Sequence, residues 1–346
     1  QKRWLIYPQN ENLSQKLGQS LQLPSSIAQV LLNRNISSLQ QARDFVKPSI
    51  SDANFDIDRL TSACQLLKDK LSSKKKVMVL GDYDADGMTS TSLMTSVLKK
   101  LGYELSFFIP HRFEDGYGLN QKIAERCVQK KISLLITLDC GITNTKEIAY
   151  LRENGVDVLL LDHHTIPTPC PDANVILNPK FYEPEHPLYD LCTVGIVFKF
   201  LVAFCETYHP EYPIQLDLDL VAIGTVADVV NLRGENRGLV QEGLVLLNQR
   251  RRLGIRLLIE EAKLGQMDIT GYHIGFVIGP ILNAAGRLST GQLGVDLLTS
   301  EHETSGRHLA KKLFSLNQKR KGLGQDILKE ALEVVEASED APIIVM

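Results

Sequence analysis

Residues 77–87 read VMVLGDYDADG, a run of apolar residues that ends in three aspartates at alternate positions. Two unit charges ~4 Å apart repel each other by roughly 4 kcal/mol at an effective dielectric near 20. Asp82, Asp84 and Asp86 therefore require a strong counter-charge, a solvated loop, or both. The identity of that counter-charge is the central question that the sequence raises.

The same stretch begins an alternation of strand and helix patterns. Strands are expected at 77–82, 104–110, 133–139 and 157–162, and helices over 89–100, from about 119, and over 144–153. The strands are continuous apolar runs, as in parallel sheets that helices cover on both faces. The pattern predicts an α/β fold, an open doubly wound parallel sheet.

At 346 residues the chain is long enough for two or three domains. The expected divisions are a mostly helical segment over 1–75, a metal-binding α/β domain over 76–230, a helical region over 231–300, a long connecting helix over 301–338, and the start of a further domain at 339–346. Because the chain opens on Gln1 and closes on APIIVM, which resembles a first strand, we expect a piece of a longer protein.

The composition excludes several classes of protein. Hydrophobic residues make up 44% and charged residues 23%, which is typical of a soluble globular protein. The six scattered cysteines form no C-x-x-C pair, which argues against a disulfide scaffold or structural zinc and favours the cytoplasm. No apolar run approaches the ~20 residues that cross a bilayer. The net charge of −3 shows no basic bias, but an acidic metal site would itself subtract charge.

Three of the expected strands end in potential metal ligands. The first delivers Asp82, Asp84 and Asp86, the third Asp139, and the fourth Asp162, His163 and His164. In open α/β sheets the ligand site lies beyond the carboxyl ends of the strands, so these groups converge on one crevice if the strands are neighbours.

A fourth candidate is Asp228, a single carboxylate within the apolar stretch AIGTVADVVNL. Burial of this group without a partner would be costly. An ion pair with Arg233 or Arg237 is one interpretation. Metal ligation is favoured, because the other acidic groups already demand a cation.

A set of carboxylates with one or two imidazoles and no thiolate suits Mn²⁺ or Mg²⁺. There are enough carboxylates for two ions, ~3.5–4 Å apart, that activate a water for attack on a phosphoryl group. Two other interpretations of DYDADG are weaker. A calcium-binding EF-hand loop would have Leu93 in place of its bidentate Glu, and a haloacid-dehalogenase-like phosphatase would not call for the D-H-H strand end.

Four motifs, GDYDADG (81–87), LDCG (138–141), LDHH (161–164) and GTVADVV (224–230), resemble in this order the DHH phosphoesterase family. The long N-terminal lead, DGYGLN (115–120) and GPILNAAGRL (279–288) resemble specifically its RecJ branch of single-strand-specific exonucleases. The resemblance covers residues 1 to about 335. It makes 339–346 the start of a DHHA1-like domain.

The resemblance implies a 5′→3′ exonuclease that degrades single-stranded DNA to mononucleotides with two Mn²⁺ or Mg²⁺ ions, in DNA repair and recombination. It implies metal ligation by Asp82, Asp84, Asp139, His163 and Asp228, with Asp86 supporting or joining them. His164 would contact the scissile phosphate or assist as an acid. Many relatives have a histidine where this chain has Met78, and the resemblance implies that Asp86 supplies the missing charge. A single-strand-binding protein or a helicase is a candidate partner.

Several residues are candidates for contacts with the nucleic acid. Asn283 and Arg287 lie one helical turn apart, Gly286 allows close backbone approach, and arginine binds phosphate in two-point contact. The alternative for Arg287 is a structural carboxylate. Arg112 is the candidate for a 5′-terminal phosphate, and Tyr117 for stacking on a base. The basic run at 250–252 is interpreted as a solvated face or a backbone contact.

Two other functions compete with the exonuclease. One is a DHH phosphodiesterase or pyrophosphatase that acts on short oligonucleotides or dinucleotides. The other is a non-catalytic replication scaffold that has lost its metals, against which the intact aspartates argue.

Overall fold

The computed structural model describes residues 6–116 and 118–336, and its centre is a five-stranded parallel sheet in the order β2-β1-β3-β4-β5. The strands are β1 (Val77–Leu80), β2 (Ser106–Phe108), β3 (Leu134–Leu138), β4 (Asp157–Leu161) and β5 (Val175–Leu177). The register pairs Val77 with Leu134 and Leu138 with Leu161. The predicted open parallel α/β sheet is confirmed.

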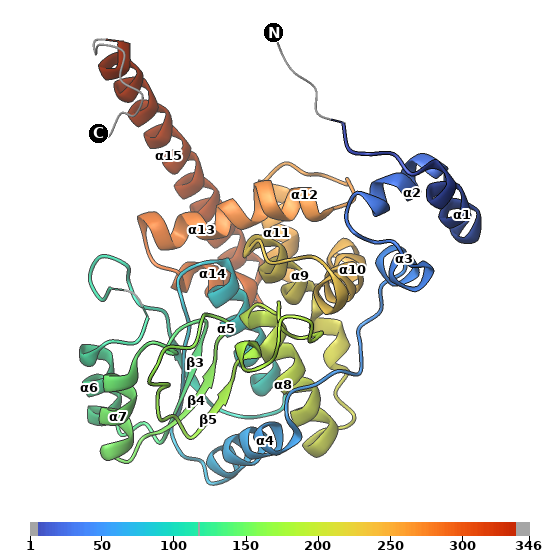
Figure 1. Cartoon of the computed structure of the whole chain (residues 1–346). Helices are drawn as coiled ribbons and strands as arrows, with labels where there is room; N and C mark the ends of the chain where they lie inside the picture. The colour runs from blue at the N-terminus through green and yellow to red at the C-terminus, as the bar shows by residue number, and fades with distance from the viewer. Residues whose placement is uncertain (1–5, 117, 337–346) are drawn as a thin grey trace.

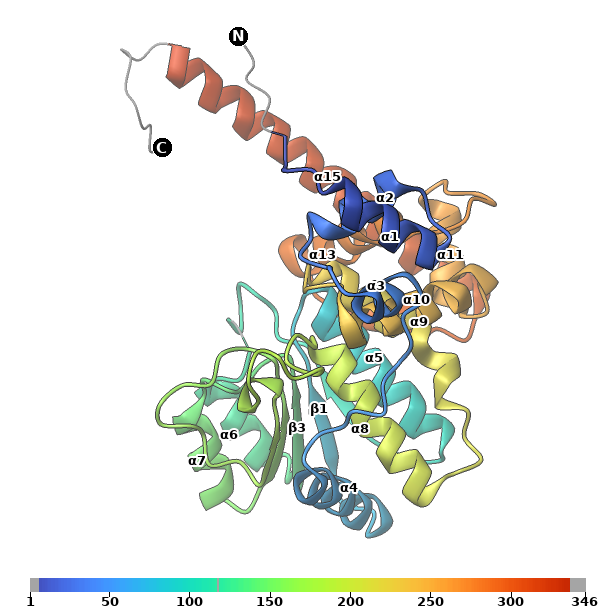
Figure 2. The same ribbon diagram turned by 45° about the vertical axis from the view of Figure 1, so that its right-hand side comes forward.

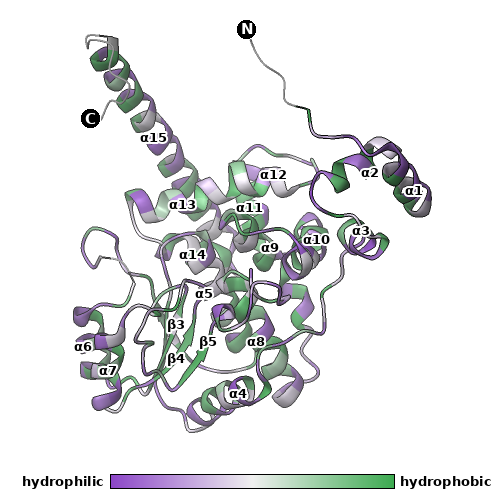
Figure 3. Cartoon of the chain, in the orientation of Figure 1, coloured by the Kyte–Doolittle hydropathy of each residue, from purple (hydrophilic) through white to green (hydrophobic). Residues whose placement is uncertain are grey.

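Helices cover both faces of the sheet, as the continuous apolar strands require (Figures 2 and 3). Val77 and Val79 belong to the core with α4 (Ile57–Ser72), α5 (Ala85–Lys100) and α8 (Thr193–Tyr208). Met78 and Leu80 point the other way, into the core with α6 (Gln121–Gln129) and α7 (Thr145–Glu153). The period-two alternation of a strand thus supplies two cores at once.

Two local features differ from the sequence interpretation. The edge strand β5 was not expected, because it is only three residues long and lies in a proline-rich stretch. Helix α5 begins at Ala85, four residues earlier than expected. Its N-cap is Asp84, whose carboxylate accepts a hydrogen bond from the N–H of Gly87 at 3.0 Å. The second acidic residue of the motif therefore also starts the helix.

The rest of the chain is helical. The helices are α1 (Glu11–Leu21), α2 (Ser25–Leu32), α3 (Leu39–Val46), α9 (Leu218–Ala227), α10 (Gly234–Gln249), α11 (Leu253–Glu261), α12 (Gly271–His273), α13 (Gly279–Leu288), α14 (Gln292–Leu298) and α15 (Glu303–Glu336), with short helices η1 (Pro179–Phe181) and η2 (Ile214–Asp217) and the π-helical turn η3 (Ile274–Ile278). Figure 1 shows α12 and α13 as one rod above the sheet and α15 projecting from the body. Across the described residues, no helix combines the length and apolarity needed to span a bilayer.

A buried polar junction fastens the N-terminal lead to the α/β domain. The Nζ of Lys199 in α8 lies 2.6 Å from Oε1 of Glu235 in α10, and both side chains are buried. Lys199 also donates to the backbone oxygen of Ser51 at 2.8 Å, and the Ser51 N–H donates to Glu235 at 2.9 Å. The segment that follows α3 is therefore tied to two helices through charged groups.

Replacement of Lys199 by Met should lower the free energy of unfolding by about 3 kcal/mol, because it leaves the Glu235 carboxylate buried without its cation. Urea unfolding followed by circular dichroism measures the change. The matched control is Lys329→Met, whose partner Glu333 is 3.9 Å away on the exposed surface of α15. An equal, small effect of both substitutions would show that the buried junction contributes nothing to stability.

Candidate metal centre

The strand order creates a crevice between the central strands β1 and β3. The chain leaves β1 for β2 on one side and returns to β3 on the other, so the connections diverge at the carboxyl ends of these strands. This is the switch point at which open α/β sheets bind their ligands. Asp82 lies two residues beyond β1, Asp139 directly follows β3, and His163 lies two residues beyond β4.

A tight turn holds the first two aspartates. A Cβ at Gly87 would lie 2.6 Å from the backbone oxygen of Asp82, so only glycine allows the chain to fold back here. The Ala85 N–H donates to Oδ1 of Asn283 at 2.7 Å, which fixes the turn from the opposite side of the crevice. Ligand oxygens of Asp82, Asp84 and Asp139 consequently lie within 4.8 Å of one another.

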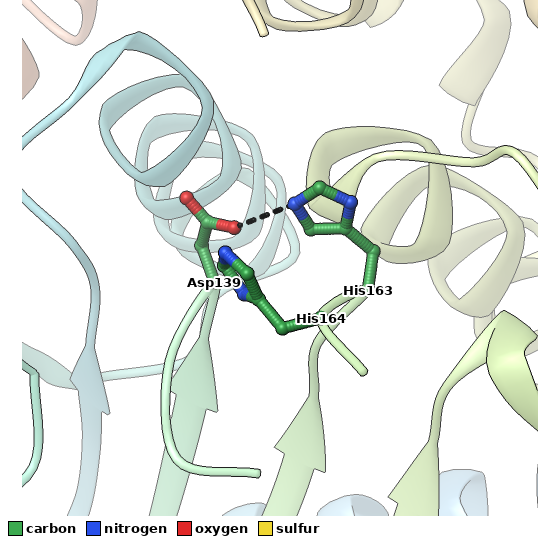
Figure 4. Close-up of side chains that lie close together, drawn as sticks. All are labelled: Asp139, His163 and His164. Carbon is green, nitrogen blue, oxygen red and sulfur yellow. Dashed lines mark ion pairs between the residues drawn. The ribbon is translucent and has the colours of Figure 1, made fainter. Parts of the chain in front are cut away.

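His163 lies between two of the carboxylates. Its Nε2 is 3.4 Å from Oδ1 of Asp139 (Figure 4). The same nitrogen is 3.6 Å from Oδ2 of Asp228. Burial lowers the pKa of His163 to about 4, so its imidazole is neutral at pH 7 and has a lone pair available for a metal. Asp139 is held in the left-handed region at φ 63°, and its Oδ1 accepts a hydrogen bond from the Thr193 hydroxyl at 2.9 Å.

Asp86 and Asp228 approach the crevice from the helical side. Asp86 is buried, and its two oxygens accept the N–H groups of Thr193 and Val194, at 2.7 and 2.9 Å, in the first turn of α8. Asp228 follows α9 and, among the described residues, forms no ion pair with either of the two arginines considered for it. Arg237 instead donates to the backbone oxygen of Phe45 at 2.6 Å.

The structure gives Asp162 a place that the sequence interpretation did not assign. Its Oδ1 lies 2.7 Å from Nδ1 of His164, and its Oδ2 accepts the Ile142 N–H at 3.1 Å. The hydrogen bond to Asp162 raises the pKa of His164, whose side chain is 48% exposed. An aspartate two residues before a histidine was the available signal, and it was interpreted only as one of several potential metal ligands at the strand ends.

The electrostatics of the cluster fit bound divalent cations. Burial, together with the charge of Asp84, raises the pKa values of Asp82 and Asp228 to about 7. Within the described residues, Oδ1 of Asp82 and Oδ2 of Asp228 are buried without a hydrogen-bond donor. Three groups of side chains have ligand atoms close enough to hold an ion: Asp82, Asp84 and Asp139; Asp139, His163 and His164; and Asp86, Cys192 and Asp228. The first two groups share Asp139, and the third adds a buried thiol to the carboxylates. Hard oxygen donors with a neutral imidazole are what Mn²⁺ and Mg²⁺ prefer.

The candidate phosphate contacts surround Tyr83. Arg112 is exposed, and its guanidinium carbon lies 5.4 Å from the centre of the Tyr83 ring. Burial raises the pKa of Tyr83, and the positive charges of Arg112 and Arg287 oppose that shift. Arg287 is exposed and pairs with no carboxylate in the described part of the chain. Both arginines therefore flank the aspartate turn.

Three expectations change in detail. The amide oxygen of Asn283 is occupied by the Ala85 N–H, so this side chain joins α13 to the aspartate turn. Gly286 does allow a close approach, but the approaching atom is the backbone oxygen of Tyr83, 2.2 Å from where a Cβ would stand. In the basic run, Arg252 is buried against Asp217 and Asp219 rather than solvated. Tyr117 lies outside the described residues.

Comparison with known proteins agrees with this geometry. The model of the DHH family, N-terminal domain, matches residues 76–225. A crystal structure of exonuclease RecJ bound to manganese superposes with a TM-score of 0.74 and 34% identity, over 82% of this chain and 71% of that one. The chain belongs to the DHH family.

Most of the curated relatives that match this chain are RecJ proteins. RecJ of Bacillus subtilis, a "single-stranded-DNA-specific exonuclease", is 36% identical over 339 residues, which cover 96% of this chain and 42% of the relative. RecJ of Thermus thermophilus in complex with Mn²⁺ matches with a TM-score of 0.81 and 29% identity, over 95% of this chain and 47% of that one. This DHH chain spans about half the length of the curated relatives it matches.

Stability of the metal-free protein should fall as pH rises between about 4 and 7. A carboxyl with a raised pKa binds its proton more tightly in the folded chain, so deprotonation of Asp82 and Asp228 costs folding free energy. The lowered pKa of His163 makes stability rise with pH in this range, but this one group opposes two carboxyls whose pKa values are raised. The melting temperature in EDTA at pH 5.5 and at pH 8 tests this pH dependence. With Mn²⁺ present, the melting temperature should instead be higher at pH 8 than at pH 5.5.

The control for this experiment is Asp228→Asn, which removes one of the raised carboxyls and should flatten the pH dependence. A melting temperature in EDTA that rises from pH 5.5 to 8 in the unsubstituted protein would contradict the electrostatic picture of the centre.

Proposed function

We propose that this chain carries the catalytic centre of a metal-dependent 5′→3′ exonuclease that hydrolyses single-stranded DNA to mononucleotides. The observation that carries the proposal is the cluster of buried and half-buried carboxylates and a neutral imidazole at the switch point, in two groups that share Asp139. The relatives are single-stranded-DNA-specific exonucleases, which supports single-stranded DNA as the substrate class.

In this proposal Asp82, Asp84, Asp139, His163 and Asp228 hold two Mn²⁺ or Mg²⁺ ions. When bound, two such ions activate a water and neutralise the charge on the phosphoryl group under in-line attack. Asp86 supports the set. Its oxygens already accept two backbone N–H groups from α8, which keeps its charge directed at the centre without a lysine or arginine.

His164 is proposed to donate a hydrogen bond to a non-bridging oxygen of the scissile phosphate or a proton to the leaving oxygen. Asp162 supports this role in two ways. Its hydrogen bond orients the ring, and its charge favours the protonated imidazole. A carboxylate–histidine pair of this kind fixes both the tautomer and the direction of the free nitrogen.

The polarity of digestion is proposed to come from Arg112. A 5′-terminal phosphate carries more charge than an internal one, and an exposed guanidinium beside the aspartate turn can bind it in two-point contact. Arg287 is proposed to hold an internal phosphate on the other side of Tyr83. Asn283 holds α13, the helix that carries Arg287, against the aspartate turn, so its proposed role is to position Arg287.

The test is digestion of a 5′-phosphorylated, 3′-labelled single strand in Mn²⁺, with duplex DNA and a dinucleotide as competing substrates. We expect shortening from the 5′ end of the single strand, abolished by EDTA. Asp84→Ala and His163→Ala should each lower the rate at least about 100-fold. The matched control is Asp172→Ala, an exposed carboxylate that precedes β5 at the opposite edge of the sheet.

Two results would contradict the exonuclease. Faster cleavage of the dinucleotide than of the long strand would indicate an enzyme for short substrates. No cleavage, together with no Mn²⁺ binding in calorimetry, would indicate a non-catalytic relative.

Asp162→Asn should lower the rate about 10- to 100-fold, because the amide cannot hold His164 in its protonated, oriented form. The pH profile of the rate distinguishes a specific effect on His164 from a general loss of folded structure. The alkaline limb of the rate should move to lower pH in the variant, since the pKa of His164 loses the contribution that raises it. Mn²⁺ affinity should stay near that of the Asp172→Asn control. An unshifted pH profile would remove His164 from the mechanism.

A further inference from the structure

Two adjoining cavities lie at the amino edge of the sheet, away from the metal centre. One of about 830 Å³ lies at the carboxyl end of α5, and one of about 770 Å³ lies beside the amino ends of β1 and β2. Residues 103–105 line both cavities and form their shared wall. The metal centre is at the other end of α5, about 24 Å away along its sixteen residues. A ligand in these cavities would therefore not touch the candidate metal ligands.

The larger cavity, here called the aromatic cavity, is lined by rings. Tyr103, Phe107 and Tyr212 line it together with Leu216, whose side chain is 48% exposed. The hydroxyl of Tyr212 donates to Asp217 at 2.7 Å, which holds this ring in place. A preformed cavity of this volume with largely apolar walls is typical of sites for planar organic groups.

The buried charges of the aromatic cavity are paired with one another, whereas cations at its rim are available. Arg252 pairs with Asp217 at 2.7 Å and with Asp219 at 2.8 Å. Arg251 beside it is exposed and, among the described residues, has no ion-pair partner. Lys99 is 70% exposed, and its contact with an exposed glutamate is 3.3 Å long. An anionic group at this rim would meet two cations without breaking the buried network.

The smaller cavity, here called the lysine cavity, is more strongly basic. Lys74, Lys75 and Lys76 line it at consecutive positions, and all three side chains are exposed. In the described part of the chain none of them forms an ion pair, and the one carboxylate in the lining is the exposed Glu104 on the shared wall. Three like charges so close together repel one another, and a multiply charged anion would convert that repulsion into attraction.

We propose that the two cavities together bind a nucleoside polyphosphate, with its base in the aromatic cavity and its phosphates on the lysine cavity. Their combined lining has seven lysine and arginine side chains against four carboxylates, in a chain whose net charge is −3. A planar ring joined to several negative charges matches both cavities, whereas a free base or an inorganic anion matches only one. The site lies apart from the metal centre and needs no Mn²⁺, so it goes beyond the proposed exonuclease activity.

Calorimetric titration with ATP in EDTA tests the site in the absence of turnover. ATP should bind at least about tenfold more tightly than adenosine or tripolyphosphate, because its two parts occupy the two cavities at once. Lys74→Ala/Lys75→Ala should weaken ATP binding at least about tenfold and leave the affinity for adenosine unchanged. The matched control is Lys311→Ala/Lys312→Ala, an adjacent pair of exposed lysines on α15, which should change neither affinity.

A second variant tests the aromatic cavity separately. Leu216→Ala removes apolar contact area and no polar partner, so it should weaken ATP binding about threefold and leave the affinity for tripolyphosphate unchanged. An unchanged tripolyphosphate affinity also shows that the variant is folded around the lysine cavity.

Four outcomes overturn the nucleotide site. They are no binding at about 1 mM ATP, equal weakening by the two double-lysine variants, tripolyphosphate that binds as tightly as ATP, and loss of ATP binding in Arg287→Ala but not in Lys74→Ala/Lys75→Ala. The last would place the nucleotide at the candidate metal centre. If the unsubstituted chain digests single strands and any of these occurs, the exonuclease proposal stands and the nucleotide site fails. Binding of ATP with the expected losses in a chain that digests nothing would support the site and contradict the exonuclease.

Discussion

Mutual repulsion among buried carboxylates is the constraint on which this structure depends. In the part of the chain that the structure describes, no lysine or arginine forms an ion pair with Asp82, Asp84, Asp86 or Asp228. At an effective dielectric near 20, each close pair of such charges opposes folding by a few kcal/mol. The fold brings Asp82 and Asp84 together with Asp139, and Asp86 together with Asp228, in groups whose ligand atoms lie within 4.8 Å of one another. Only a cation bound between them turns the repulsion into binding free energy.

The scaffold tolerates this charge because backbone N–H groups stabilise the carboxylates, a role that lysine and arginine side chains have in ordinary ion pairs. The first turn of α8 presents two N–H groups to Asp86, and the first turn of α5 presents one to Asp84. The amino end of a helix also carries a partial positive charge that favours carboxylates. A lysine in these places would compete with a metal for the ligands, whereas a backbone N–H stabilises the carboxylate without occupying its remaining lone pairs.

The sequence predicted the parts of this arrangement that depend on one segment at a time. Continuous apolar strands predicted the parallel sheet, and aspartates at the ends of β1, β3 and β4 predicted the convergence at its carboxyl edge. Contacts between distant segments were beyond such reasoning. Gly286 and Asn283 in α13 resembled a phosphate-binding motif, yet both contact the aspartate turn about 200 residues earlier in the chain. The same limit applied to Arg252, whose buried partners Asp217 and Asp219 carry no local pattern that distinguishes them from surface aspartates.

This long-range contact also explains why the rod can serve two purposes. Because Gly286 and Asn283 hold α13 against the turn that carries Asp82 and Asp84, any displacement of the rod would move these candidate metal ligands with it. Arg287 is on that rod and remains exposed, so the residue proposed to hold a phosphate is coupled to the carboxylates proposed to bind the metal ions. The phosphorus atom and the attacking water must be held roughly 3–3.5 Å apart, and a misplacement of about 1 Å can lower the rate on the order of 100-fold. Carrying grip and catalysis on one rigid unit meets that requirement better than a flexible binding loop would.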